Sequence, residues 1–122
     1  MGLLSDFIKN IGQAEKKKIE EHLNELLLPT EQMTATFDFT SDIMIFTDRR
    51  LIWVDKQRIG NNRIYYKSFP YRSISHFEIE IYGVGKFKFW TLASTEPVIS
   101  MTILDVKTAF AFQRAFAEVV SN

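Results

Sequence analysis

Side chains able to perform acid, base or metal chemistry are few in this sequence of 122 residues. It contains two histidines, His22 and His76, and no cysteine. The lack of cysteine excludes thiol nucleophiles, disulfides, thiolate metal sites and iron–sulfur clusters. His76 lies beside Glu78 on an expected strand, but such a pair is fewer than the three protein ligands usual at a catalytic zinc. We therefore expect two surface histidines and no metal site.

Sequence motifs of common enzyme classes are also missing. There is no Gly-x-Ser-x-Gly turn, no His-Glu-x-x-His pair and no glycine-rich phosphate loop. The short run Gly83-Val84-Gly85 falls in an expected turn between strands, whereas a nucleotide loop joins a strand to a helix. We expect no catalytic residues and no cofactor, and therefore a protein that binds without catalysing a reaction.

Charge is balanced over the whole chain but not along it. Fifteen basic and fifteen acidic residues cancel, so the molecule as a whole is not drawn to nucleic acid or to an anionic membrane. Residues 48–72 carry seven basic and two acidic residues, with Trp53, Tyr65, Tyr66 and Phe69 among them, a mixture typical of anion and single-stranded nucleic acid surfaces. The alternative is a set of solvated strand faces, because side chains alternate across a strand and do not all reach one groove. The candidate anion patch comprises Arg49, Arg50, Lys56, Arg58, Arg63 and Lys67.

The elements that would position these residues begin with a helical segment over residues 1–30. Apolar residues recur at helical spacing on both sides of Gly12, which predicts two amphipathic helices, and Pro29 ends the second. These helices could cover the strands, a neighbouring subunit or a membrane, although the glutamates around Lys16–Lys18 favour packing on protein. The apolar positions are Leu4, Phe7, Ile8, Ile11, Ile19, Leu23, Leu26 and Leu27.

The rest of the chain is expected to form strands and one further helix. Alternating polarity predicts seven antiparallel strands within residues 31–104, and Asp105 caps an amphipathic helix over residues 105–121. We expect one domain, 1–122, of mainly β structure. The predicted strands are residues 32–39, 43–47, 50–55, 63–69, 75–82, 86–92 and 98–103.

The strand register of two hairpins can be predicted from the sequence. A three-residue turn at 83–85 would place Tyr82 opposite Lys86, which pairs opposite charges on one face and apolar side chains on the other. The predicted pairs are Glu80 with Lys88 and Ile81 with Phe87. The second hairpin turns at Asp48-Arg49 and pairs Phe46 with Leu51, Met44 with Trp53, Ile45 with Ile52 and Ile43 with Val54.

The second hairpin is apolar on both faces. A small barrel buries only the inner face of each strand, so the other face needs a cover. The N-terminal helices, through Leu23, Leu26 and Leu27, and a second subunit are both possible covers. The candidate oligomer interface is Met44, Phe46, Leu51 and Trp53.

Three stretches of the sequence resemble the bacterial pleckstrin-homology (PH)-like domain family. They are the run from Asp42 to Leu51, the run from Ser68 to Ile74 that contains Pro70-Tyr71, and the strand His76–Glu80. The resemblance implies a PH-like barrel of about seven strands capped by the C-terminal helix. It also implies a cytoplasmic protein with a tendency to assemble into homo-oligomeric rings and with no established catalytic activity.

The family comparison also bears on the ligand. PH domains that bind phosphoinositides use lysine and arginine on the first two strands and the loop between them, whereas here that loop is the short, acidic Thr40–Ile43. We therefore expect no phosphoinositide site. A nucleic acid partner is not expected either, because the basic side chains of residues 48–72 lie on alternating strand faces. The predicted function is a scaffold that self-assembles and binds a protein partner; the alternative is a membrane or nucleic acid adaptor that uses residues 48–72.

Overall fold

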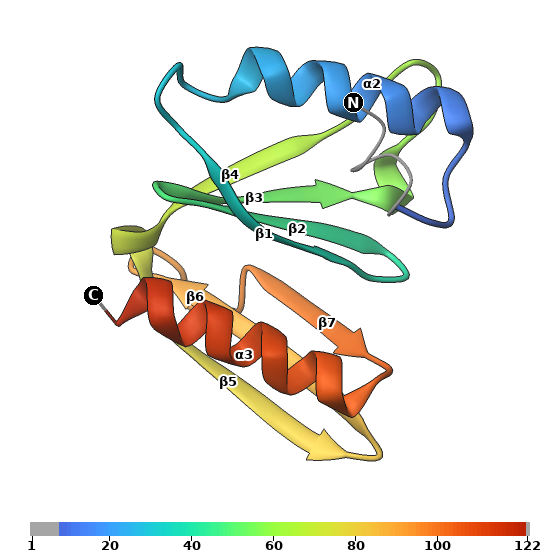
Figure 1. Ribbon diagram of the computed structural model, residues 1–122. Helices are drawn as coiled ribbons and strands as arrows, with labels where there is room; N and C mark the ends of the chain where they lie inside the picture. The colour runs from blue at the N-terminus through green and yellow to red at the C-terminus, as the bar shows by residue number, and fades with distance from the viewer. Residues whose placement is uncertain (1–7, 122) are drawn as a thin grey trace. The chain divides into compact units, whose positions relative to one another are not determined.

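The computed structural model describes residues 8–121 and divides the chain into two compact units, Met1–Ser68 and Phe69–Asn122 (Figure 1). The first unit contains α2 (Gln13–Leu26), β1 (Met33–Asp38), β2 (Asp42–Thr47), β3 (Arg50–Asp55) and the short 3₁₀ helix η1 (Lys56–Arg58). The second contains η2 (Tyr71–Ser73), β5 (Ile74–Tyr82), β6 (Val84–Thr91), β7 (Ile99–Ile103) and α3 (Val106–Val120). Strand β4 (Tyr66–Pro70) runs across the division.

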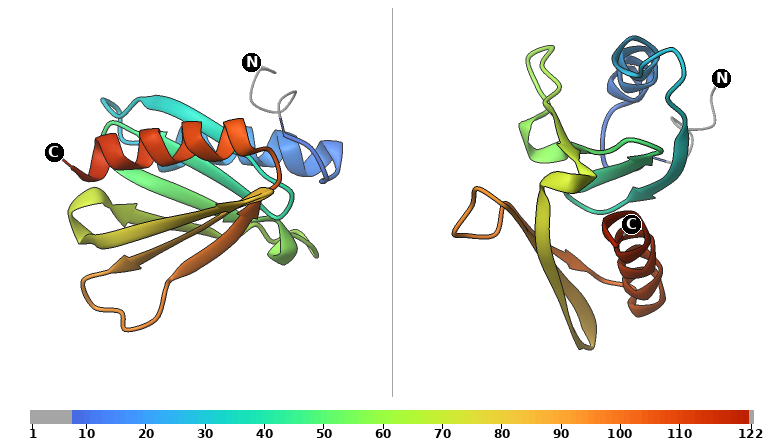
Figure 2. Two further views of the ribbon diagram at one scale, coloured as in Figure 1. Left: turned by 90° about the horizontal axis from the view of Figure 1, so that it is seen from below. Right: turned by 90° about the vertical axis from the view of Figure 1, so that its left-hand side faces the viewer.

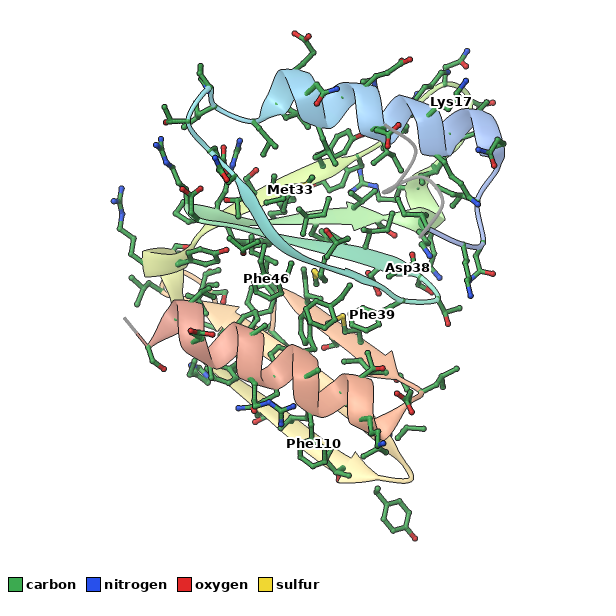
Figure 3. The ribbon with its side chains drawn as sticks, in the orientation of Figure 1. Lys17, Met33, Asp38, Phe39, Phe46 and Phe110 are labelled. Carbon is green, nitrogen blue, oxygen red and sulfur yellow. The ribbon has the colours of Figure 1, made fainter. Side chains whose placement is uncertain are left out.

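In the first unit, α2 lies along one face of an antiparallel sheet with strand order β1-β2-β3-β4 (Figures 1 and 2). Its apolar side packs Ile19 and Leu23 onto the sheet, with Ile8 from the preceding segment and Leu27 partly buried beside them. Lys17 extends from the opposite side of the helix (Figure 3). The strand residues beneath the helix are Ile43, Ile45, Ile52 and Val54. The N-terminal helix therefore covers one of the two apolar faces of the β2–β3 hairpin.

Polar contacts hold the segment between α2 and β1 in place. Glu31 is buried, and its carboxylate accepts hydrogen bonds from Arg50 (Nε at 2.9 Å) and from the hydroxyl of Thr47 at 2.6 Å. The other Glu31 oxygen accepts from the backbone N–H of Leu28 at 3.1 Å. Buried carboxylates are tolerated when they are paired and hydrogen-bonded, so this cluster fixes the path of the chain out of the helix.

The connection between β3 and β4 lies beside α2 (Figure 2). It turns at Gly60–Arg63 with positive φ angles at Asn61 (50°) and Asn62 (63°), a conformation that asparagine tolerates better than most residues. Lys18 donates a hydrogen bond to Asn62 at 3.1 Å. Residues more than forty positions apart thus join the helix to this turn.

In the second unit, α3 crosses one face of a three-stranded sheet with order β5-β6-β7 (Figures 1 and 2). Asp105 caps the helix by accepting a hydrogen bond from the backbone N–H of Thr108 at 3.0 Å, as predicted. Ala109 contacts the sheet so closely that a Cβ on Gly85 would lie 2.5 Å from the Ala109 Cβ. The core below the helix is a cluster of aromatic rings formed by Phe77, Phe87, Phe89, Phe112 and Phe116.

One predicted register is wrong and the other is confirmed. In the β5–β6 hairpin Tyr82 pairs with Val84, not Lys86, because Gly83 makes the turn alone at φ +75°. The shift of two residues keeps every side chain on its predicted face, and charges still pair as Glu80 with Lys86 and Glu78 with Lys88. The β2–β3 register, with Phe46 opposite Leu51 and Met44 opposite Trp53, is confirmed.

The predicted helices are confirmed only in part. The second N-terminal helix begins after Gly12, where the break was expected. The first, predicted from Leu4, Phe7, Ile8 and Ile11, is wrong for residues 8–12, which are not helical and include a positive φ of 67° at Asn10; its earlier part lies outside the described residues. The helix predicted over residues 105–121 is amphipathic: Ala109, Phe112 and Phe116 of α3 are buried, whereas Phe110, labelled in Figure 3, is 44% exposed. Between residues 8 and 121, neither helix has the length and apolar character needed to span a membrane.

Candidate functional site

An aromatic and arginine cluster lies at the end of β3 in the first unit. Trp53 and Tyr65 pack edge to face with ring centroids 6.0 Å apart, and the guanidinium carbon of Arg58 lies 3.7 Å from the centroid of the Tyr65 ring. Trp53 and Tyr65 are half-buried, and Arg58 is exposed. Edge-to-face rings and a cation over a ring face are favourable contacts, so the cluster is held in one arrangement. We refer to these three residues as the Trp53 cluster.

Asp42 orients the Trp53 indole. The indole Nε1–H donates a hydrogen bond of 2.7 Å to Asp42 Oδ1 from the neighbouring strand β2. Burial raises the pKa of Asp42, the indole hydrogen bond opposes this, and the carboxylate of Asp55, its partner across the strands, raises it further. The indole is therefore fixed at its polar end while its ring stays partly accessible.

The other three residues of the predicted oligomer interface are buried, unlike Trp53. Met44, Phe46 and Leu51 are 0%, 1% and 0% exposed in the single chain. The assignment of these three residues to an interface between subunits stays a prediction. Of the predicted set, Trp53 alone reaches the surface, and the structure adds Tyr65 and Arg58 to it.

Lys56 does not belong to an exposed anion patch, contrary to the prediction. Its side chain is 3% exposed, and its ammonium lies 2.7 Å from Asp38 Oδ1. The same ammonium donates hydrogen bonds to the backbone carbonyls of Phe39, at 2.6 Å, and Lys9, at 2.7 Å. A buried ammonium needs such partners. The charge of Lys56 is therefore used to attach the N-terminal segment to the sheet.

Arg50 is occupied in a similar way. Besides Glu31, its guanidinium donates to the carbonyl of Leu26 at 2.8 Å and to the Ser68 hydroxyl at 3.1 Å. The hydrogen bond from Arg50 is the largest of the causes that lower the pKa of Glu31 from 4.5 to about 2. Arg50 thus stabilises a buried carboxylate and is not a free cation for a ligand.

The remaining basic side chains of the predicted patch, Arg49, Arg58, Arg63 and Lys67, are exposed. Arg49 precedes β3 and donates to the Thr30 hydroxyl, whereas Arg58 and Arg63 follow the other end of that strand. A strand of six residues is roughly 20 Å long, about twice the distance over which salt screens exposed charges. Arg49 is therefore about one strand length away from Arg58 and Arg63 and does not share a groove with them.

Both histidines are exposed, as predicted. His22 Nδ1 lies 2.9 Å from the hydroxyl of Tyr66, whose pKa is raised by burial, and His76 stacks on Trp90 with ring centroids 4.4 Å apart. Among residues 8–121, no three histidine, aspartate or glutamate side chains gather closely enough to hold a metal ion.

The sequence named Tyr65 only as one of four aromatic residues within 48–72 and did not predict its contact with Trp53. The segment from Lys56 to Tyr65 contains a 3₁₀ helix and a turn, so its length does not reveal which residue packs against Trp53. The available signal was the composition of this segment, in which Trp, Tyr and Arg occur close together.

Comparisons with known proteins confirm the resemblance seen in the sequence. The family model described as bacterial PH domain matches residues 2–120. A relative from Bacillus subtilis (strain 168), the uncharacterized protein YjqA, is 31% identical over 123 residues, which cover 98% of each chain.

Two solved structures are similar in fold. The pleckstrin homology domain from Shewanella amazonensis SB2B has a TM-score of 0.73 and 26% identity, covering 86% of this chain and 97% of its own. A DUF1696 family protein with a pleckstrin-homology domain from Shewanella loihica PV-4 has a TM-score of 0.68 and 24% identity, covering 85% and 95%. With two antiparallel sheets, a C-terminal helix and a family model that spans nearly the whole chain, this protein belongs to the bacterial PH domain family.

Proposed function

We propose that this bacterial PH domain is a non-catalytic interaction module that assembles into a homo-oligomer and binds a protein partner. The observation that carries the proposal is the Trp53 cluster, in which a tryptophan, a tyrosine and an arginine lie in contact at the surface of the first unit. These are the residue types that most often dominate the binding energy of protein interfaces.

The cluster is also preorganised. Trp53 is held by Asp42, Tyr65 by the edge of the indole, and Arg58 by the face of the Tyr65 ring. Side chains already ordered before binding lose little conformational entropy when a partner covers them, so more of the contact energy appears as affinity.

The test is the solution mass of the intact chain, measured by light scattering after size exclusion at micromolar concentration. We compare the parent with Arg58→Glu, which reverses an exposed charge in the cluster, and with Arg63→Glu, which makes the same change at an exposed position on the turn. The parent is expected to be a defined multimer, and Arg58→Glu to weaken its assembly by roughly 30-fold or more, the scale of losing one dominant interface residue. Arg63→Glu is expected to assemble as the parent does.

A parent that stays monomeric throughout the micromolar range contradicts self-assembly. A multimer that Arg58→Glu leaves intact would instead show that the subunits meet through another surface. Circular dichroism of both variants confirms that a change in mass does not come from unfolding.

A further inference from the structure

The outward face of the sheet in the second unit carries an ordered array of polar side chains. This face is opposite to α3, and its residues are exposed while the intervening ones, such as Phe87 and Met101, are buried. Strand pairing sets Lys88 opposite Ser100 and Lys86 opposite Thr102. The array therefore has two ammonium groups on one strand and two hydroxyl groups on the next.

A surface depression of about 170 Å³ lies over this array. Both lysines and both hydroxyl residues line it, together with Phe87 and Met101, and no acidic residue does. Pockets that hold drug-sized ligands or cofactors measure about 300–1,000 Å³. The depression is therefore of a size for a small ion or a single charged group.

Neither lysine is engaged elsewhere among residues 8–121. No carboxylate lies within ion-pair distance of Lys86 or Lys88, although Glu80 and Glu78 are their partners in register on β5. The glutamates border the lysine row on one side, and the depression lies on the other, over β6 and β7. An anion over β6 and β7 would thus meet the ammonium groups while staying farther from the carboxylates.

The spacing suits a group with several oxygen atoms. Residues two apart on a strand are separated by roughly 7 Å and cross-strand partners by roughly 5 Å, so the four side chains mark the corners of a small rectangle. A tetrahedral phosphate at its centre directs oxygens to both ammonium groups and to both hydroxyl groups, which are all able to donate hydrogen bonds. Strands hold such donors in place better than loops do.

We propose that Lys86, Lys88, Ser100 and Thr102 form a binding site for a phosphate group, carried either by a small soluble molecule or by a lipid headgroup. The site lies wholly in the second unit and does not depend on the assembly proposed for the Trp53 cluster. It is also separate from the basic segment 48–72.

The experiment is a titration of the intact ¹⁵N-labelled chain with inorganic phosphate and, at matched ionic strength, with chloride, followed by amide chemical shifts. Phosphate is expected to give saturable shifts centred on residues 86–88 and 100–102. The double variant Lys86→Gln with Lys88→Gln should bind about tenfold more weakly. Lys107→Gln, an exposed lysine on α3, is the matched control and should not change the affinity. Glu80→Gln should strengthen binding because it removes a neighbouring negative charge.

Shifts that are no larger with phosphate than with chloride, or that persist unchanged in the double variant, overturn the proposal. Sedimentation with vesicles of phosphatidylcholine, with and without phosphatidic acid, distinguishes the two sources of phosphate. Lysine-dependent sedimentation with phosphatidic acid assigns the site to lipid headgroups, whereas phosphate binding without such sedimentation assigns it to soluble ligands.

Discussion

The two units attach a helix to a sheet by different means. In the first unit the contact combines aliphatic packing with buried charge, and Glu31, Thr47 and Lys56, the buried polar residues of the described chain, all lie there. In the second unit the helix rests on phenylalanine rings.

The reason for the difference is the connection that each helix has to its sheet. Six residues separate α2 from β1, and the segment before α2 must also be attached, so directional contacts from Glu31 and Lys56 fix both. Only Leu104 and Asp105 separate β7 from α3, and the Asp105 cap already sets the start of that helix. Apolar packing, which has no directional requirement, is then enough to hold α3 on its sheet. The stability of the first unit should consequently depend on pH. The stability of the second should depend on the volume of its buried side chains.

The largest effect is expected from Phe116→Ala. Phe116 is fully buried, and its ring lies 4.8–5.0 Å from those of Phe77, Phe87 and Phe89. Truncation removes these contacts and leaves a cavity, which should lower the free energy of unfolding by about 3–5 kcal/mol. Urea denaturation measures the loss. Phe110→Ala, on the exposed side of the same helix, should lose less than about 1 kcal/mol; equal losses would show that α3 is not anchored by its buried rings.

The next effect concerns Glu31 and the pH dependence of stability. Its folded pKa of about 2 lies below the ordinary 4.5, so ionised Glu31 favours folding by about 3 kcal/mol at neutral pH. This stability is complete above about pH 5 and is lost as the pH falls from 4.5 toward 2. Glu31→Gln should be destabilised at pH 7 by about 2–3 kcal/mol, and the difference from the parent should vanish near pH 2.

The measurement for Glu31 is urea denaturation of the parent and Glu31→Gln at several pH values between 2 and 7. Glu25→Gln, an exposed carboxyl on α2, is the control for a general loss of negative charge. If the two curves for Glu31→Gln and the parent stay parallel down to pH 2, the buried ion pair is not the source of the acid sensitivity.

The smallest effect expected is that of Gly85→Ala in the second unit. The added methyl group would lie 2.5 Å from the Ala109 Cβ, so helix and sheet must separate slightly, at about 1–3 kcal/mol. Ala109→Gly removes the atom that the new methyl group would meet. The double variant should therefore be more stable than the sum of the two single losses predicts. A strictly additive pair in thermal or urea denaturation would contradict the close approach of α3 to β6.

The predictable parts of this fold are those set by local periodicity. The β2–β3 register was predictable because a two-residue turn at Asp48-Arg49 leaves one pairing that matches apolar partners on both faces. The β5–β6 register was not predictable. Two pairings that differ by two residues place every side chain on the same face, and both set glutamates opposite lysines. The conformational freedom of Gly83 at φ +75° then decided in favour of the tighter turn.

The order of the strands, the cap at Asp105, the helix start after Gly12 and membership of the bacterial PH domain family can all be read from the amino-acid sequence. Periodicity and turn chemistry act between neighbours along the chain, so one sequence is enough to read them. Three-dimensional packing was needed to show that Lys56 and Arg50 are engaged inside the first unit and that Tyr65 and Arg58 contact Trp53. It was also needed to show that two lysines share a depression with two hydroxyl groups. The physical reason is that charge and burial depend on groups far away in sequence, whose approach no local pattern specifies.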